Sequence, residues 1–246
     1  MAFQKLVRFE KNGSPYYGDL LESSKEGHKI EILSGNLADG FRSTGQIATA
    51  SNLTVPKYPV IFTKPGDALA GPNDVVHVHP DAQPKLDYEG ELCVIIGRDA
   101  KDVSEHNALD YVLGYTAGND ISARNFQIPE ASGGQFCYAK SFDGFAPIGP
   151  VICSPTVVPD PQSLQLKTLV NGEIVQETGT SDMIWSVRQI IAHISRGTTI
   201  RRGTVIMTGT PSGVGFFKNH FLKNGDVVEV EIKGIGKISN QISFDS

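Results

Sequence analysis

The sequence of 246 residues has little of what disulfide-rich, membrane-spanning or nucleic-acid-binding proteins need. Its three cysteines, Cys93, Cys137 and Cys153, are odd in number and lack metal-ligand spacing, so we expect reduced thiols. No apolar run approaches the roughly 18 residues of a membrane span. Lysine and arginine number 22 against 27 acidic residues, which argues against nucleic acid or an anionic membrane as a partner. Because the first residues carry no apolar signal core, we expect a cytoplasmic protein, with a mitochondrial location left open.

What is present is the composition of a globular protein, with 39% hydrophobic and 20% charged residues. Residues 1–50 hold short alternating segments separated by glycine and charged turns, which predict a small N-terminal β appendage. The polar stretch 43–60, closed by two prolines, is expected to be a linker or mobile loop. Residues 51–246 are expected to form the main domain.

The main domain is predicted to be mostly β. Asn171-Gly172 stands between two alternating runs and predicts a hairpin, and residues 228–232 alternate apolar and charged side chains as in a strand with one wet face. The clearest helix is expected to start at a cap at Thr180 or Ser181 and to run to Ile194. Strands and helices do not alternate regularly, so the predicted class is α+β with a mixed sheet arrangement.

Acidic residues gather at the start of one apolar strand. Glu91 directly precedes the apolar run Leu92–Ile96. Glu89 lies two residues before Glu91, and Asp87 lies two residues before Glu89. Positions i and i+2 of a strand share a face, so all three acids are expected to point to one place. Asp120 ends the next apolar strand, and three such carboxylates can select a hard cation such as Mg²⁺, Mn²⁺ or Ca²⁺. An E-x-E pair taken alone favours a solvated strand face instead.

Two later segments carry a cation and a polar loop. Lys140 lies among small and aromatic residues where a strand is expected to emerge, although a lone lysine is more often on the surface. The apolar run Val205–Met207 leads into a Thr- and Gly-rich loop that contains Thr210. The hydroxyls and backbone N–H groups of such a loop can hold a carboxylate or phosphate, or the loop is simply a tight turn.

Four segments in this order and spacing resemble the fumarylacetoacetate hydrolase (FAH) superfamily over residues 55–243: "LDYEGELCVIIG", "GNDISARNFQ", "AKSFDGFAPIGP" and "VIMTGTPSGVG". The resemblance implies a mixed, rolled β-sheet with short flanking helices, and thus an FAH-type catalytic domain over 51–246. It also implies a homodimer and a divalent metal, Mg²⁺ first, with Mn²⁺ or Ca²⁺ as alternatives. Members of the family cleave, decarboxylate or isomerise β-dicarbonyl and acylpyruvate-type acids, so a small oxo acid is the expected substrate.

The resemblance implies three metal ligands, Glu89, Glu91 and Asp120, and four active-site residues, Lys140, Arg124, Gln127 and Thr210. Arg124 and Gln127 match polar residues of the pocket, and Thr210 matches the loop threonine that holds a substrate carboxylate or carbonyl. We expect Lys140 to be a fixed positive charge beside a developing enolate, in a solvated site. Asp87 matches no firm role, and a hydrogen-bond acceptor behind the ligands is a plausible one.

One family feature is missing. The lid segment of the form G-x-N-Y-x-x-H-x-x-E supplies a His and a Glu as general base, and the matching place near Ala50-Ser51 has neither. Either the chain lacks this lid, which leaves decarboxylation or tautomerisation easier than hydrolysis, or a mobile lid segment is omitted from the sequence.

The leading hypothesis is a metal-dependent hydrolase or decarboxylase that breaks a C–C bond in a β-diketo or 2-oxo acid. Hydrolysis would be of the acylpyruvate or fumarylacetoacetate type, and decarboxylation of the oxaloacetate type. Alternatives are a keto–enol isomerase or a biosynthetic tailoring enzyme on the same fold, and a non-catalytic scaffold protein.

Overall fold

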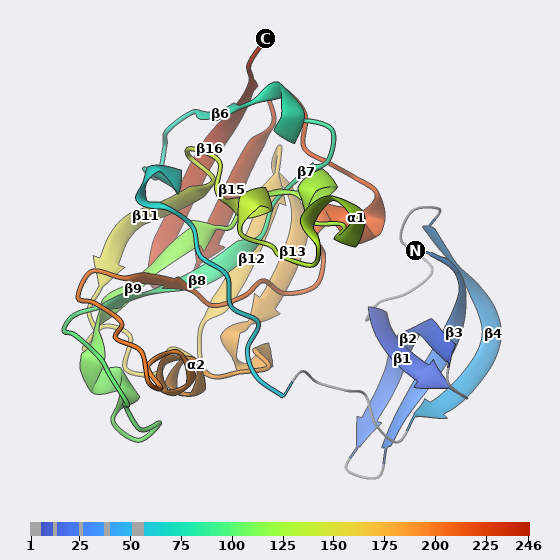
Figure 1. Cartoon of the computed structure of the whole chain (residues 1–246), viewed down its shortest axis with the longest axis horizontal. Helices are drawn as coiled ribbons and strands as arrows, with labels where there is room; N and C mark the ends of the chain where they lie inside the picture. The colour runs from blue at the N-terminus through green and yellow to red at the C-terminus, as the bar shows by residue number, and fades with distance from the viewer. Residues whose placement is uncertain (1–5, 12–13, 25–26, 37–39, 51–56) are drawn as a thin grey trace. The chain divides into compact units, whose positions relative to one another are not determined.

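A computed structural model describes residues 6–11, 14–24, 27–36, 40–50 and 57–246 of the chain (Figure 1). The chain divides into two compact units, residues 1–58 with 217–219 and residues 59–216 with 220–246. Compactness alone does not show that a unit folds by itself, so the domain boundary expected at residue 50 stays a prediction.

The smaller unit contains a four-stranded antiparallel sheet in chain order: β1 (Leu6–Lys11), β2 (Ser14–Ser24), β3 (Gly27–Asn36) and β4 (Gly40–Ala50). Ile30, Ile32 and Leu33 of β3 are buried. The linker expected over 43–60 is wrong for residues 43–50, because this part of β4 pairs with β3. Backbone hydrogen bonds form a ladder whatever the polarity of the side chains, so Ser/Thr-rich text does not exclude a strand. Residues 51–56 of the expected linker lie outside the described ranges.

The larger unit has two five-stranded sheets. The first has the order β14 (Val205–Met207), β8 (Gly90–Ile96), β9 (Val112–Asn119), β11 (Ala146–Cys153) and β5 (Leu69–Ala70). The second has the order β13 (Glu173–Gly179), β12 (Gln165–Val170), β15 (Val227–Ile232), β16 (Gly236–Phe244) and β6 (Val76–Val78). The short strands β7 (Leu86–Asp87) and β10 (Ser122–Ala123) pair with each other. Two pairs, β11–β5 and β16–β6, are parallel and the others antiparallel, which confirms the expected mixed, mostly β fold.

The main core lies between the two sheets. All seven residues of β8 are buried, as expected for its unbroken apolar run. Leu92, Val94 and Ile96 of β8 belong to one cluster with Val230 and Ile232 of β15. Buried apolar area stabilises a fold by about 25 cal/mol per Å², so this cluster helps to hold β8 in place. The acids therefore lie at the start of a fully buried strand.

Helices are few and short: α1 (Pro129–Ser132), α2 (Val187–Ile194) and α3 (Gly215–Lys218). The helix start expected at Thr180 or Ser181 is wrong. Ser186 caps α2 through a capping box with Gln189, and Ile184 lies before the helix and is 67% exposed. The Asn171-Gly172 hairpin is confirmed, since both residues have positive φ values, 51° and 83°, as a type I′ turn requires.

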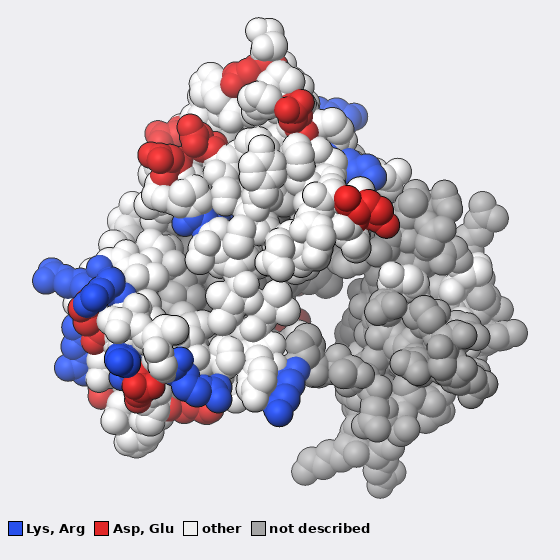
Figure 2. All heavy atoms as spheres, viewed as in Figure 1, with Lys and Arg blue, Asp and Glu red and all other residues white. Residues whose placement is uncertain are grey.

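Among the described residues no helix is long and apolar enough to cross a membrane. Figure 2 shows both signs of charge on the visible face of the larger unit, with much of that face uncharged. This face has no continuous basic field of the kind that follows a nucleic-acid backbone.

Candidate metal centre

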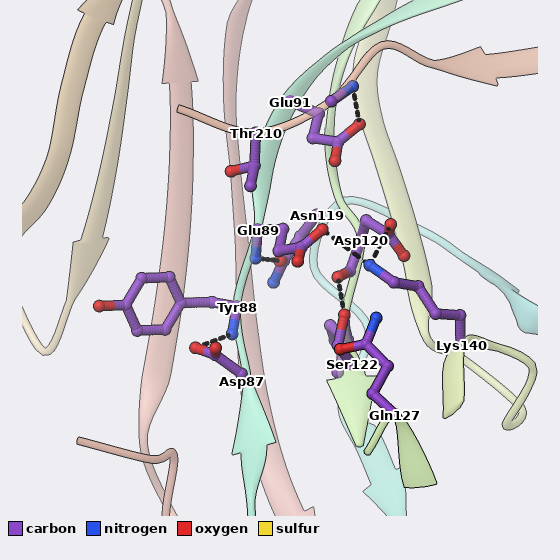
Figure 3. A network of polar contacts seen from close by, with 12 residues as sticks. Asp87, Tyr88, Glu89, Glu91, Asn119, Asp120, Ser122, Gln127, Lys140 and Thr210 are labelled. Atoms are coloured by element: carbon purple, nitrogen blue, oxygen red, sulfur yellow. Dashed lines mark hydrogen bonds and ion pairs between the residues drawn. The ribbon is translucent and has the colours of Figure 1, made fainter. Parts of the chain in front are cut away.

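The candidate metal centre lies where the chain enters β8 and where β9 ends (Figure 3). The antiparallel register of these strands sets Gly90 opposite Asn119. Asp120, which follows β9, therefore lies beside Glu89, and its N–H donates to the Glu89 carbonyl oxygen at 2.8 Å. Glu89 and Glu91 occupy alternate positions around Gly90. Local alternation and one strand pairing thus bring three carboxylates together.

Ligand oxygens of Glu89, Glu91 and Asp120 lie within 4.8 Å of one another, and all three residues are buried. Octahedral Mg²⁺ at about 2.1 Å keeps its ligand oxygens within roughly 4.2 Å, and Ca²⁺ at about 2.5 Å within roughly 5 Å. The cluster therefore fits a hard divalent cation with little or no contraction. One Glu91 oxygen accepts from the Gly209 N–H at 2.7 Å, and the other accepts no hydrogen bond from the described residues. An all-carboxylate set of this kind favours Mg²⁺, Mn²⁺ or Ca²⁺ over softer metals.

Lys140 lies inside this carboxylate cluster, as the stick view shows (Figure 3). Its Nζ is 2.7 Å from Glu89 Oε2 and 2.6 Å from Asp120 Oδ2. Lys140 is only 2% exposed, so the expectation of a solvated site is wrong. The ring of Phe62, whose centroid lies 4.8 Å from Nζ, contacts the ammonium from a segment far away in the sequence.

Burial and the neighbouring charges shift the pKa values of this cluster. Burial by itself would lower the pKa of Lys140, but Glu89 and Asp120 outweigh it and raise that pKa. Burial would raise the pKa of Glu89, but Lys140 and Arg124 lower it below its ordinary value. The pKa of Glu91 is raised well above its ordinary value by burial and by the like charges of Asp120 and Glu89. Burial likewise raises the pKa of Asp120, although Lys140 and Lys64 oppose that shift. Lys140 therefore keeps its proton on Nζ, and a cation that binds to Glu91 and Asp120 competes there with protons.

Arg124 connects the cluster to residues behind it. Its Nε donates to Asp87 Oδ2 at 2.8 Å, its Nη1 donates to Gln127 Oε1 at 2.8 Å, and its Nη2 forms an ion pair with Glu89 Oε1 at 2.6 Å. Three nitrogens of the guanidinium are thus engaged within the protein. Arg124 holds Glu89 in place, and it turns the amide nitrogen of the half-buried Gln127 away from itself.

Asp87 does not join the carboxylate cluster, so the expectation that all three acids point to one place is wrong. Asp87 belongs to a different strand, because β7 ends at Asp87 and pairs with β10, whereas Glu89 directly precedes β8, which begins at Gly90. The Asp87 carboxylate instead accepts from the N–H groups of Tyr88, Gly215 and Phe216, besides Arg124. Asp87 thus accepts a hydrogen bond from Arg124, which in turn pairs with Glu89. It lies behind the proposed metal ligands and is not one of them.

The loop after β14 is attached to β8 residue by residue. The Thr208 hydroxyl donates to Leu92 O at 2.9 Å, the Gly209 N–H donates to Glu91, and the Thr210 hydroxyl donates to Gly90 O at 3.0 Å. The hydroxyl hydrogen of Thr210 is therefore used within the protein. Thr210 lies at the site, but its hydroxyl is available to a substrate only if this bond to Gly90 breaks.

Gln176 on β13 also belongs to the site, although no sequence motif points to it. It is 2% exposed, and its Nε2 donates to Thr210 Oγ1 at 2.8 Å and to Pro211 O at 3.0 Å. Its Oε1 accepts from the Gly90 N–H at 3.0 Å. Gly90 stands between two proposed ligands, so one amide from the second sheet fixes both the metal strand and the loop.

Lys64 is the second residue that sequence reasoning missed, although it stands in the family-like text "VIFTKP". Its Nζ is 2.8 Å from Asp120 Oδ1, so each oxygen of Asp120 faces one lysine. Burial lowers the pKa of Lys64, and the nearby Asp120 opposes that shift. The signal available in the sequence was a lysine inside an otherwise apolar, proline-bounded segment.

Histidines contact no residue of the cluster within the described ranges. His77 pairs with Asp245 at 3.0 Å and His79 lies 3.7 Å from Asp81, both well exposed. The place of the missing lid, near Ala50-Ser51, falls at the end of β4 and on residues outside those ranges.

The structure thus has three buried carboxylates beside a buried lysine on a mixed β fold. This arrangement is typical of a protein that holds a hard cation next to an ammonium. The family described as "Fumarylacetoacetate (FAA) hydrolase C-terminal" matches residues 33–243. The oxaloacetate tautomerase YisK of Bacillus subtilis is 41% identical over 198 residues, which are 80% of this chain and 65% of that protein. The mitochondrial oxaloacetate tautomerase fahd2 of Xenopus laevis is 40% identical over 193 residues, 78% of this chain and 60% of that protein.

A solved structure is similar over its whole length. The 5-carboxymethyl-2-hydroxymuconate delta-isomerase of Mycobacterium smegmatis has a TM-score of 0.71 at 29% identity, with 98% of this chain and 100% of that chain covered. The chain belongs to the fumarylacetoacetate hydrolase family. This chain spans less than two thirds of the length of the two tautomerases.

Proposed function

We propose that this chain is a divalent-metal-dependent enzyme that interconverts the keto and enol forms of a small 2-oxo dicarboxylic acid such as oxaloacetate. The observation that carries the proposal is the Lys140 ammonium in contact with two of three clustered carboxylates. A hard cation and a fixed ammonium side by side suit a substrate that becomes an enolate. The names of the tautomerase and isomerase relatives support interconversion as the reaction.

Glu89, Glu91 and Asp120 would hold the cation, which when bound supplies Lewis-acid stabilisation of the developing enolate oxygen. Lys140 keeps its proton on Nζ and adds a second positive charge next to that oxygen. Gln127 offers its amide N–H groups to a substrate carboxylate, since its oxygen is occupied by Arg124. Lys140 is 2% exposed and its Nζ lies over the ring of Phe62, and this burial strengthens its electrostatic effect.

The second candidate is cleavage of a C–C bond, by hydrolysis of an acylpyruvate-type acid or by decarboxylation of oxaloacetate. The family description supports it, since it names a hydrolase. Both candidates pass through an enolate, so both use the same charges. Interconversion moves a proton between the carbon next to the carbonyl and solvent water or a side chain, whereas hydrolysis needs in addition a base that activates the attacking water.

The experiment is a turnover assay with oxaloacetate, fumarylpyruvate and fumarylacetoacetate, with Mg²⁺ or Mn²⁺ and with EDTA. Ultraviolet absorbance follows the enol, and NMR identifies the products. We expect accelerated loss of enol without a change in composition, abolished by EDTA and by Glu91→Gln. Appearance of pyruvate from oxaloacetate or fumarylpyruvate, or of acetoacetate from fumarylacetoacetate, at the same rate would favour cleavage. No metal-dependent turnover of any oxo acid would refute both candidates and favour a scaffold.

We also propose that the protein is a homodimer and acts on a free small molecule, on the basis of family membership. Light scattering at micromolar concentration tests the first point, and a monomer mass contradicts it.

A further inference from the structure

Lys64 is a buried charged side chain for which the proposed reaction has no use. Its side chain is 10% exposed, and it stands on the irregular segment before β5 rather than on a strand of the site. A lysine ammonium is rarely buried without full pairing, because removing the charge from water costs several kcal/mol. The atoms that pair with Lys64 Nζ therefore indicate the role of this side chain.

Four oxygens surround the Lys64 ammonium. The Asp120 carboxylate lies at 2.8 Å, and the carbonyl oxygens of Ile121, Lys140 and Phe145 lie at 3.2, 2.6 and 2.8 Å. An ammonium has only three hydrogens to donate, so this cage holds the positive charge as a whole rather than three separate hydrogen bonds. Oxygen ligands of this type, one charged and three neutral, also suit a small cation.

The oxygens come from the parts of the chain that carry the central ion pair. Ile121 follows Asp120 directly, and the Lys140 carbonyl belongs to the residue whose ammonium contacts Asp120. Lys64 thus contacts the carboxylate of one partner and the backbone of the other. It acts on Asp120 Oδ1, while Oδ2 faces Lys140.

We propose that Lys64 is a positioning residue whose ammonium serves as a fixed internal cation, holding the Asp120 carboxylate oriented for the divalent metal. Each carboxylate oxygen has two lone pairs, so Asp120 can accept from a lysine and still bind a metal. Without Lys64 the oxygen cage keeps its negative potential and takes a small ammonium ion from solution. The inference rests on the metal centre of the proposed function, but not on which oxo acid is the substrate.

The test measures Mn²⁺ binding by calorimetry and by the Mn²⁺ paramagnetic resonance signal, on the full chain without substrate. Lys64→Met retains the apolar stem and removes the charge, and Lys64→Ala also opens space for an amine. Lys167→Met is the matched control, because it removes one lysine charge from β12 that pairs only with the exposed Glu177. We expect Mn²⁺ affinity to fall about 10- to 100-fold in both Lys64 variants, as for other groups that orient metal ligands, and to be unchanged in the control.

Ethylammonium is expected to restore most of the lost Mn²⁺ affinity to Lys64→Ala, but not to Lys64→Met, whose stem fills the space. Tetramethylammonium at the same ionic strength should restore nothing, because it has no N–H group. Wild-type Mn²⁺ affinity in Lys64→Met, equal effects of both amines, or loss of fold in both variants would overturn the proposal. Absence of Mn²⁺ binding to the wild-type protein would instead overturn the metal centre itself.

Discussion

Replacement of Lys140 by methionine tests the electrostatic design of the site most directly. The substitution keeps the stem of the side chain and removes an ammonium that lies 2.7 Å from Glu89 and 2.6 Å from Asp120. Both carboxylates are buried, so water cannot replace the lost ammonium, although Arg124 still pairs with Glu89 and Lys64 still pairs with Asp120. Removing one member of a buried ion pair costs about 3–5 kcal/mol. At about 2–4 °C per kcal/mol for a chain of this size, the melting temperature in EDTA should fall by roughly 6–20 °C.

Bound metal and pH should both change how much stability the Lys140→Met variant loses relative to the wild type. A bound divalent cation replaces the missing positive charge, so saturating Mg²⁺ should narrow the gap between the variant and the wild type. Lys140 lowers the pKa of Glu89 and opposes the burial that already raises the pKa of Asp120, so without Lys140 both folded-state pKa values should rise. The variant then loses stability as pH rises above about 4, and the gap should be wider at pH 7 than at pH 5.

The assay is thermal unfolding in EDTA and in Mg²⁺ at both pH values, together with turnover at saturating metal. Turnover should fall at least about 100-fold, the scale for loss of one preorganised charge. Lys167→Met is the control, and its exposed ion pair should contribute less than about 1 kcal/mol. If Lys140→Met in EDTA melted with that control, or turned over substrate near the wild-type rate, the reasoning about Lys140 would be refuted.

Three further predictions concern the same site. Glu91→Gln should abolish detectable Mg²⁺ binding in calorimetry, and retained affinity would contradict the ligand assignment. The melting temperature of this variant in EDTA should stay level or rise, because the change removes like-charge repulsion. Since the pKa of Glu91 is raised well above its ordinary value, Mg²⁺ binding at pH 5 should release protons. Calorimetry in buffers of different ionisation enthalpy measures this release, and binding without it would contradict the raised pKa. Gln176→Met should lower kcat more than Gln162→Met does. Gln162→Met is the control, because it removes a comparable amide remote from the carboxylates. Equal kcat values would show that Gln176 is only structural.

Local pattern determined much of the fold and of the candidate site in advance. The apolar run Leu92–Ile96 specifies a buried strand, and the alternation at Glu89 and Glu91 puts two carboxylates on one face of it. Asn171-Gly172 specifies its hairpin, because few other dipeptides adopt two positive φ values. These features need only neighbours in the sequence, so the sequence alone is sufficient for them.

The helix start and the linker show where local pattern was insufficient. Ser186 with Gln189 forms a better cap than Thr180 or Ser181, since both of its reciprocal hydrogen bonds are made. The Ser/Thr-rich residues 43–50 form β4 because a partner strand was available, and propensity does not report partners.

Only the tertiary structure decided what surrounds the three carboxylates. Lys64 reaches carbonyl oxygens 57, 76 and 81 residues away, and Gln176 reaches Gly90 across 86 residues. A lysine or glutamine carries no local sign of such partners, because its long side chain is solvated equally well in most sequences. The partners of Lys64 are backbone oxygens, which every residue has, so residue types could not identify them. The acids, Lys140 and Arg124 were therefore identified from the sequence, whereas the roles of Lys64 and Gln176 were decided by the way the sheets and connecting segments come together.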